Sequence, residues 1–143
     1  MDIPENAMDL AMVFEGFRSK PYLCPAGHWT IGWGHLCAKD HPQITKEQGR
    51  IYLTKDLQVA LRGTLRICPI LLLEKETAWL GAIADFVFNL GAGRLQTSTL
   101  RRKINSEEWE DVPVELIKWI YGGGRKLRGL ILRREAEARY FNV

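Results

Sequence analysis

The segment VFEGFRSKPYLCPAGHWTIGWGH, residues 13–35, decides how the rest of the chain is interpreted. It begins at the end of an apolar stretch and then changes to aromatic and β-branched residues interrupted by proline and glycine. Such a pattern is typical of short strands joined by tight turns. The segment also contains a glutamate, a cysteine, a threonine and two histidines. We therefore expect a small β structure that presents several reactive side chains.

Glu15 is the first reactive residue of this segment. It lies near the end of a short predicted helix, residues 7–17, among apolar neighbours that favour the protonated form of a carboxyl group. A carboxylic acid that stays protonated near neutral pH can donate a proton to a leaving oxygen. A solvated glutamate at a helix end would look the same by itself, so the interpretation depends on the residues that follow.

Two small polar residues follow Glu15 at defined intervals. Eight residues separate Glu15 from Cys24, and five separate Cys24 from Thr30. Hydrolysis of a glycosidic bond needs an acid on one face of the sugar and a group that activates water on the other. Glu15 would supply the acid, and the second group in this chain would be a thiol instead of a carboxylate.

The remainder of the chain is predicted to be helical. Thr45 and Gln48 form a capping-box pattern, and the helix that they begin is expected to end before Pro69. An apolar helix over residues 74–90 is expected in the core, with Gly91 as its C-terminal cap. Further elements are expected as a strand over residues 29–34 and helices over residues 98–104, 114–121 and 130–140.

These elements predict an α+β fold that is mainly helical. A small β-containing N-terminal lobe, residues 13–45, would be joined by a linking helix, residues 45–68, to a helical lobe, residues 74–143. A single domain of 143 residues can bury a core without metal or disulfide support. The cleft between the two lobes is the expected ligand site.

Composition excludes several classes of protein. Hydrophobic residues make up 46% of the chain and charged residues 26%, which is typical of folded globular proteins. No segment has the roughly 18 uninterrupted apolar residues of a membrane span, and the acidic N-terminus does not resemble a signal peptide. The three cysteines contain no CxxC pair, and Cys37 and Cys68 are expected to be packing residues. No motif implies a metal, nucleotide or redox cofactor.

The opening segment resembles the signature of phage-type lysozymes, the endolysins of glycoside hydrolase family 24. Their catalytic pattern is Glu, eight residues, Asp or Cys, five residues, Thr; Glu15, Cys24 and Thr30 match its cysteine form. The similarity covers almost the entire chain. FVFNLGAGRLQTSTLRRKIN resembles the family's Phe-Asn-x-Gly segment, and KWIYGGGRKLRGLILRREAEARYF resembles its C-terminal block.

The resemblance implies a lysozyme-like fold and an N-acetylmuramidase, which cleaves the β-1,4 bond between N-acetylmuramic acid and N-acetylglucosamine in peptidoglycan. Glu15 would be the proton donor, Cys24 would occupy the position usually held by aspartate, and Thr30 would help to hold the water. Substrate-binding roles are assigned to Trp29, Gly34, Phe88 and Asn89, and a structural role to His35. Cys24 could either activate a water, with inversion, or attack the anomeric carbon itself.

The resemblance also implies a biological setting. The enzyme is expected to accumulate in the host cytoplasm as a monomer, to depend on a holin-like pore, and to act on the cell wall or periplasm after release. Its substrate partner would be peptidoglycan, and no nucleic-acid partner or transmembrane anchor is expected.

Two other classes of function fit parts of the sequence. A cysteine hydrolase would need Cys24 beside a general-base histidine, for which His28 and His35 are the candidates. A wall- or nucleic-acid-binding module without activity could use the arginine-rich C-terminal end. A solvated helix face is the preferred interpretation of these arginines, which are Arg128, Arg133, Arg134 and Arg139.

Overall fold

A short helix, α1 (Glu5–Glu15), precedes the sheet in the computed structural model, which describes residues 1–74 and 76–141. The helix ends at Gly16, whose φ of 68° lies in the left-handed region that glycine adopts without a Cβ clash. The helix predicted over residues 7–17 is therefore present, and it begins and ends two residues earlier than predicted. Glu15 is its last residue, and the chain turns into the sheet immediately afterwards.

Three antiparallel strands follow, and Tyr22 of the first pairs with Thr30 of the second. The strands lie side by side in the order β1 (Arg18–Leu23), β2 (Trp29–Gly32) and β3 (His35–Leu36). The prediction of one strand over residues 29–34 is wrong. It breaks because Gly32 and Gly34, with φ values of 64° and 76°, turn the chain back on itself.

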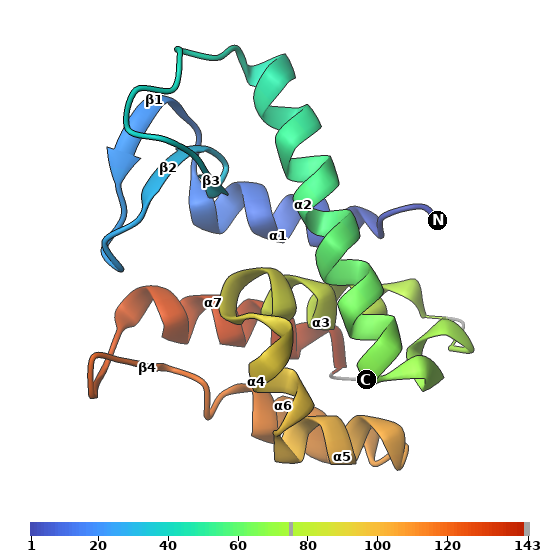
Figure 1. Ribbon diagram of the computed structural model, residues 1–143. Coiled ribbons are helices and arrows are strands. Elements are labelled where there is room, and N and C mark those ends of the chain that lie inside the picture. Colours follow the sequence, from blue (N-terminus) through green and yellow to red (C-terminus); the bar gives the residue numbers. More distant parts are fainter. Residues whose placement is uncertain (75, 142–143) are drawn as a thin grey trace.

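The linking helix α2 (Lys46–Ile67) runs from the sheet to the second lobe (Figure 1). The backbone N–H of Gln48 donates to the Thr45 hydroxyl at 3.1 Å, and the Gln48 side chain accepts from the Thr45 N–H at 2.9 Å. The predicted capping box is therefore confirmed. Leu53 and Leu57 of α2 pack with the sheet side of the core, whereas residues nearer its C-terminal end pack in the helical lobe.

The C-terminal lobe is built around α3 (Thr77–Leu90), in which every residue from Leu80 to Val87 is buried. This confirms the predicted core helix. The other helices of the lobe are α4 (Ala92–Gln96), α5 (Thr99–Asn105), α6 (Val112–Leu116) and α7 (Arg128–Ala138). Single 3-10 turns are found at Pro69–Leu72, Trp109–Asp111 and Arg139–Phe141.

The predicted helix over residues 114–121 is wrong in its C-terminal half, because α6 ends at Leu116. The chain forms a small hairpin instead, in which β4 (Tyr121–Gly122) pairs with β5 (Arg125–Lys126). Gly123 and Gly124 at its tip both have positive φ, as a tight two-residue hairpin turn requires. The glycine run therefore decides the local structure here.

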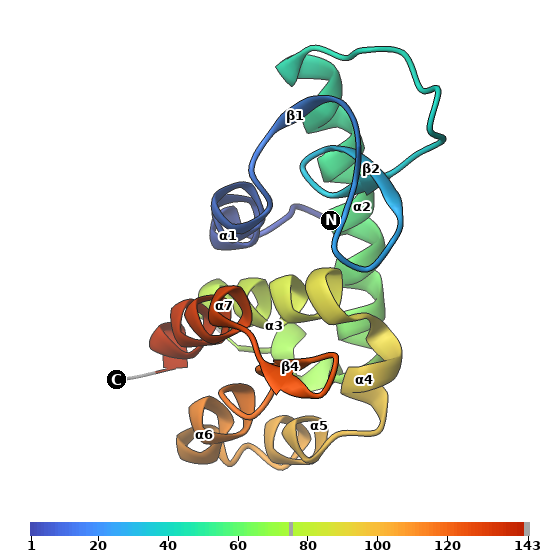
Figure 2. The ribbon, with the colours of Figure 1, turned by 90° about the vertical axis from the view of Figure 1, so that its left-hand side faces the viewer.

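Helix α1 packs against α3 and α7 of the C-terminal lobe, although it belongs to the other end of the sequence. Figure 2 shows α1 beside the sheet, with α3 and α7 lying below it. The end of α1 is thus the place where the sheet and the C-terminal lobe meet. The mainly helical α+β fold predicted from the sequence is confirmed. Across the residues that the structure describes, no helix has both the length and the apolar character needed to cross a membrane.

Candidate active site

Glu15 extends from the end of α1 to an arginine of α7. The Nη1 group of Arg133 donates a hydrogen bond to Glu15 Oε2 at 2.5 Å. The Nε and Nη2 groups of Arg133 donate to the two carboxylate oxygens of Asp85 on α3, at 2.9 and 2.7 Å. The sequence prediction considered only the apolar neighbours of Glu15. The structure adds a guanidinium group that bonds to one of its carboxyl oxygens.

The prediction of a solvated arginine face is wrong for two of its four members. Arg133 is 3% exposed and Arg134 is fully buried, whereas Arg128 is exposed. Arg134 Nε lies 2.7 Å from Glu137 Oε1, and its Nη2 donates to Asn89 Oδ1 at 2.8 Å. Two consecutive arginines of α7 are therefore directed into the protein.

Asp85 is the sequence signal that could have revealed this arrangement. It is the single charged residue in TAWLGAIADFVFNL, the sequence of α3, and it is fully buried. A buried carboxylate requires a charged partner or several hydrogen bonds. An aspartate in an otherwise apolar core helix therefore predicts a buried cation, and the arginine-rich C-terminal segment was the obvious source.

Burial and opposite charges set the proton affinities of this cluster. Burial acts to raise the pKa of Asp85, but hydrogen bonds from Arg133 outweigh it and hold that pKa below its usual value. Burial raises the pKa of Glu137 well above its usual value, which favours the neutral acid.

Cys24 lies just after β1, in the turn that leads to β2. The backbone N–H of His28 donates to Cys24 Sγ at 3.4 Å. This and other donors of the turn lower the pKa of the thiol, because they stabilise the thiolate. The Thr30 hydroxyl donates to the His28 carbonyl at 3.0 Å, so Cys24 and Thr30 both bond to His28. The structure thus brings these two predicted residues together.

Tyr22 is a residue of the site that the sequence reasoning missed. It pairs with Thr30 across the sheet, and side chains two residues apart on a strand share a face, so Tyr22, Cys24 and Thr30 are expected on one face. Burial raises the pKa of Tyr22, and the charges of Glu15 and Cys24 add to this effect. Tyr22 therefore lies within electrostatic reach of both reactive groups. Its position two residues before Cys24 was the signal that could have indicated it.

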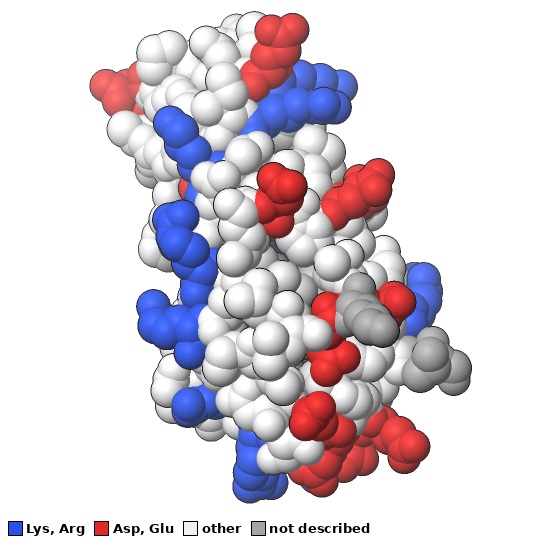
Figure 3. Space-filling model, turned by 90° about the vertical axis from the view of Figure 1, so that its right-hand side faces the viewer, with Lys and Arg blue, Asp and Glu red and all other residues white. Residues whose placement is uncertain are grey.

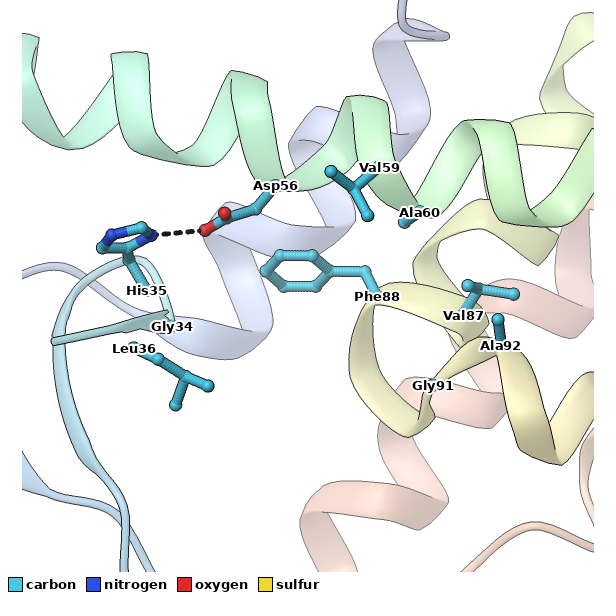
Figure 4. Close-up of a pocket in the computed structure, with 10 residues that line it drawn as sticks. All are labelled: Gly34, His35, Leu36, Asp56, Val59, Ala60, Val87, Phe88, Gly91 and Ala92. Carbon is cyan, nitrogen blue, oxygen red and sulfur yellow. Dashed lines mark hydrogen bonds and ion pairs between the residues drawn. The ribbon is translucent and has the colours of Figure 1, made fainter.

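A pocket of about 390 Å³ lies between the lobes (Figure 4). It is lined by Gly34, His35, Leu36, Asp56, Val59, Ala60, Val87, Phe88, Gly91 and Ala92. Two of the four predicted substrate-binding residues, Gly34 and Phe88, belong to this lining. Figure 4 shows the Phe88 ring extending from α3 toward Asp56 and His35 on the opposite side. A pocket with apolar walls and a few polar groups at one end is typical of a ligand site.

His35 connects the sheet to α2. Its Nδ1 atom lies 2.8 Å from Asp56 Oδ2, and its ring stacks on Tyr52 at 4.4 Å between centroids. An imidazole held by a carboxylate and an aromatic ring is well suited to the structural role assigned from the sequence. The same contacts direct His35 toward α2.

The other two predicted substrate-binding residues do not line the pocket. Asn89 accepts a hydrogen bond from Arg134, on the side of α3 that faces α7. The Trp29 ring has the Lys39 ammonium over it, 5.6 Å from the centroid. Both side chains are half-buried.

Gly34 brings the Glu15 carboxyl group to the edge of the pocket. A Cβ atom at this glycine would lie 2.7 Å from Glu15 Oε1, and its φ of 76° is one that other residues rarely adopt. The two carboxyl oxygens therefore have different surroundings. Oε2 is held by Arg133, and Oε1 lies next to Gly34, which is a residue of the pocket lining.

Replacing Gly34 with alanine is expected to lower kcat about a hundredfold, because the new methyl group displaces Glu15 by a fraction of an ångström or more. Gly93→Ala is the matched control: nothing lies within 4 Å of a Cβ atom there, and its φ is unremarkable. Clearing of peptidoglycan suspensions measures both rates. Equal rates for the two variants would contradict the close contact between Gly34 and Glu15.

The family model described as phage lysozyme matches residues 12–137. The chain belongs to the phage lysozyme family. An endolysin of Acyrthosiphon pisum secondary endosymbiont phage 1 is 35% identical, over 99% of this chain and 98% of that protein. A SAR-endolysin of bacteriophage PS34 is 37% identical, over 86% of this chain and 73% of that protein.

Solved structures share the fold of this phage lysozyme. The muramidase domain of SpmX from Asticaccaulis excentricus has a TM-score of 0.86 at 24% identity, covering 99% of this chain and 98% of that one. The active form of P1 phage endolysin Lyz has a TM-score of 0.83 at 24% identity, covering 96% and 83%. The lysozyme-like fold, the family and the glycoside hydrolase activity predicted from the sequence are confirmed.

Proposed function

We propose that this chain cleaves the β-1,4 bond between N-acetylmuramic acid and N-acetylglucosamine, with Glu15 as the acid that protonates the leaving oxygen. The chain is a peptidoglycan-hydrolysing phage endolysin by its family. The observation that best supports the role of Glu15 is its asymmetric placement. One carboxyl oxygen is held by Arg133 and the other faces the pocket edge at Gly34.

The residues of the sheet supply the second half of the proposed reaction. Glu15 donates its proton to the glycosidic oxygen as the bond from this oxygen to the anomeric carbon breaks. A water positioned by the Thr30 hydroxyl attacks that carbon and gives its proton to the Cys24 thiolate. The backbone donors that stabilise this thiolate make it available near neutral pH. Proton exchange with solvent then restores both groups.

Product analysis tests the proposed function. Purified Gram-negative peptidoglycan is digested with the enzyme, and the fragments are reduced and analysed by mass spectrometry. We expect muropeptides that end in reduced N-acetylmuramic acid. Fragments that end in reduced N-acetylglucosamine would indicate the other glycosidic bond, and free peptides would indicate an amidase or peptidase; either result contradicts the proposal.

Cys24→Ser is expected to lower kcat about a hundredfold or more, because a hydroxyl is a far weaker base than a thiolate. Cys24→Asp restores a carboxylate at the position where the family pattern has one, and we expect a rate within about tenfold of wild type. Both rates are measured as reducing ends released per enzyme. A Cys24→Ser enzyme as active as wild type would show that the thiol takes no part in the chemistry.

We further propose that the enzyme acts on the cell wall or periplasm as a monomer, after leaving the host cytoplasm through a holin-like pore. The endolysin relatives support the cell wall as the place of action. Co-expression with and without a holin provides the test for release. Lysis that is equally fast without the holin would contradict the dependence.

The two alternative functions lose support in the structure. A basic binding module depended on the C-terminal arginines, but Arg133 and Arg134 are buried, where they contact Asp85 and Glu137. On the side of the molecule drawn in Figure 3, basic side chains form a column along one edge and acidic side chains gather toward the opposite, lower side, so that side is not uniformly basic. For a cysteine hydrolase, His28 contacts Cys24 through its backbone, and His35 is paired with Asp56.

A further inference from the structure

We propose that Asp85 is a positioning residue for the hydrolytic reaction, acting on Glu15 through Arg133. It lies on α3, does not line the pocket, and is fully buried. The inference rests on the proposed role of Glu15 as the acid. It adds that a carboxylate remote from the substrate determines which oxygen of Glu15 carries the proton and at what pH the proton is lost.

Arg133 donates hydrogen bonds to two different carboxyl groups. Nε and Nη2 donate to the two oxygens of Asp85 at 2.9 and 2.7 Å, and Nη1 donates to Glu15 Oε2 at 2.5 Å. The guanidinium group is planar and rigid, so two bonds to one carboxylate determine the direction of the remaining N–H groups. Asp85 thereby aims Nη1 at Glu15.

Packing prevents Arg133 from adopting another orientation. The ring centroids of Phe14 on α1 and Phe88 on α3 lie 5.6 and 5.9 Å from its Cζ atom. Arg133 is 3% exposed, so water cannot readily replace either carboxylate as its partner. The side chain is therefore held by two aromatic rings as well as by its ion pairs.

This arrangement makes the two oxygens of Glu15 chemically distinct. Oε2 accepts a hydrogen bond from the Nη1–H of Arg133, and a proton bound to Oε2 would be repelled by the hydrogen of that donor. The proton is therefore carried by Oε1, which faces Gly34 at the edge of the pocket. The orientation set by Asp85 thus places the transferable proton on the oxygen that a substrate can approach.

Several charged or titratable groups surround the Glu15 carboxyl group and Arg133. On the sheet side these are Tyr22 and Cys24, which couple electrostatically to Glu15 or to each other. On the helical side they are Asp85 of α3, and Arg133, Arg134 and Glu137 of α7. Among these groups, Asp85 bonds to Arg133 and does not contact Glu15 itself. Removing its negative charge therefore changes the surroundings of Arg133 without altering any atom that contacts Glu15.

The first test is the pH dependence of kcat in Asp85→Asn. The substitution keeps the shape of the side chain and removes a negative charge, which leaves the charge of Arg133 to act on Glu15 alone. Glu15 then loses its proton at lower pH, and the high-pH limb of kcat moves down by about 1 pH unit. At pH values above that limb, kcat falls roughly tenfold. KM stays unchanged, because Asp85 does not line the pocket.

Arg133→Lys is expected to move the same limb in the opposite direction. An ammonium group has no planar fork, so it cannot bond both oxygens of Asp85 and also reach Glu15. It pairs with Asp85, which is fully buried, and leaves Glu15, whose side chain is 20% exposed, to water. Glu15 then retains its proton to higher pH. Opposite shifts from two substitutions in one buried network would not follow from a general loss of stability.

Glu137→Gln is the matched control within the same cluster. Burial favours the neutral form of Glu137, so glutamine replaces it with little change in charge or shape. The high-pH limb is expected to coincide with that of wild type. Thermal melting followed by circular dichroism establishes that each variant is folded at the assay temperature.

The outcomes separate this inference from the proposed function. A shift of the high-pH limb of kcat to lower pH in Asp85→Asn, and to higher pH in Arg133→Lys, supports the inference. Unshifted limbs, or shifts of the same sign, overturn it while the wild-type enzyme still yields N-acetylmuramic acid ends. If wild type yields no such ends, the proposed function itself fails. If Asp85→Asn does not fold, the high-pH limb of Arg133→Lys decides the question. A shift of this limb to higher pH supports the inference, and an unchanged limb or a shift to lower pH overturns it.

Discussion

Glu15→Gln is expected to reduce kcat by about a thousandfold while peptidoglycan binding is retained. General acid catalysis contributes roughly 100-fold to 10,000-fold to enzymatic rates, and glutamine has no proton to give to the leaving oxygen. The glutamine oxygen can accept the Nη1–H of Arg133 as Oε2 does, so the side chain keeps its place. The amide nitrogen then faces Gly34, where Oε1 was.

Two measurements check this prediction. Reducing ends released per enzyme give kcat, and co-sedimentation with purified peptidoglycan measures binding. Glu5→Gln is the control, because Glu5 is exposed in the first turn of the same helix. A Glu15→Gln enzyme that turns over as fast as this control would disprove the assignment of the acid.

Arg134→Ala is expected to lower the free energy of unfolding by about 3 to 5 kcal/mol, because it leaves a cavity where a large, fully buried side chain packed and leaves buried polar groups without their partner. The substitution leaves Glu137 and Asn89 without the guanidinium that they bind. It also removes the side chain that packs over the Phe86 ring, 5.1 Å from its centroid. Urea denaturation measures the change.

Arg128→Ala is the control for this substitution, because Arg128 begins the same helix and is exposed. Surface substitutions of this kind usually change stability by less than about 0.5 kcal/mol. Similar losses in the two variants would mean that burial does not distinguish these arginines. Comparison of Arg134→Ala with Arg128→Ala therefore tests whether Arg134 is buried, in contrast to the solvated arginine face that the sequence predicted.

Local patterns predicted most of the secondary structure. Thr45 and Gln48 cap the linking helix as expected, and Gly16 and Gly91 end the helices that precede them. Such signals succeed because the atoms that they involve lie within a few residues of one another. The errors also have local causes. Gly32 divides a predicted strand, and the glycines of the β4-β5 hairpin end a predicted helix early.

The candidate site also contains residues that local sequence patterns indicated and one that they did not. The spacing of Glu15, Cys24 and Thr30 was visible in the sequence, because all three lie in one segment and the sheet brings the last two together through a single turn. Phe88 was indicated by the family pattern, and the structure places it on the pocket wall. Asp85 was not indicated, because its role depends on a side chain of another helix.

The sequence by itself determined most of the order of the elements and which residues are the catalytic candidates, because both appear as patterns among near neighbours. Only the tertiary structure decided where the arginines of α7 point. Arg133 meets Asp85 and Glu15 across 48 and 118 residues of chain, and no local pattern encodes contacts over such distances. The physical reason is the cost of burying a charge: once α3 placed Asp85 in the core, the lowest free energy was reached by bringing a guanidinium to it, and the same guanidinium then reached Glu15.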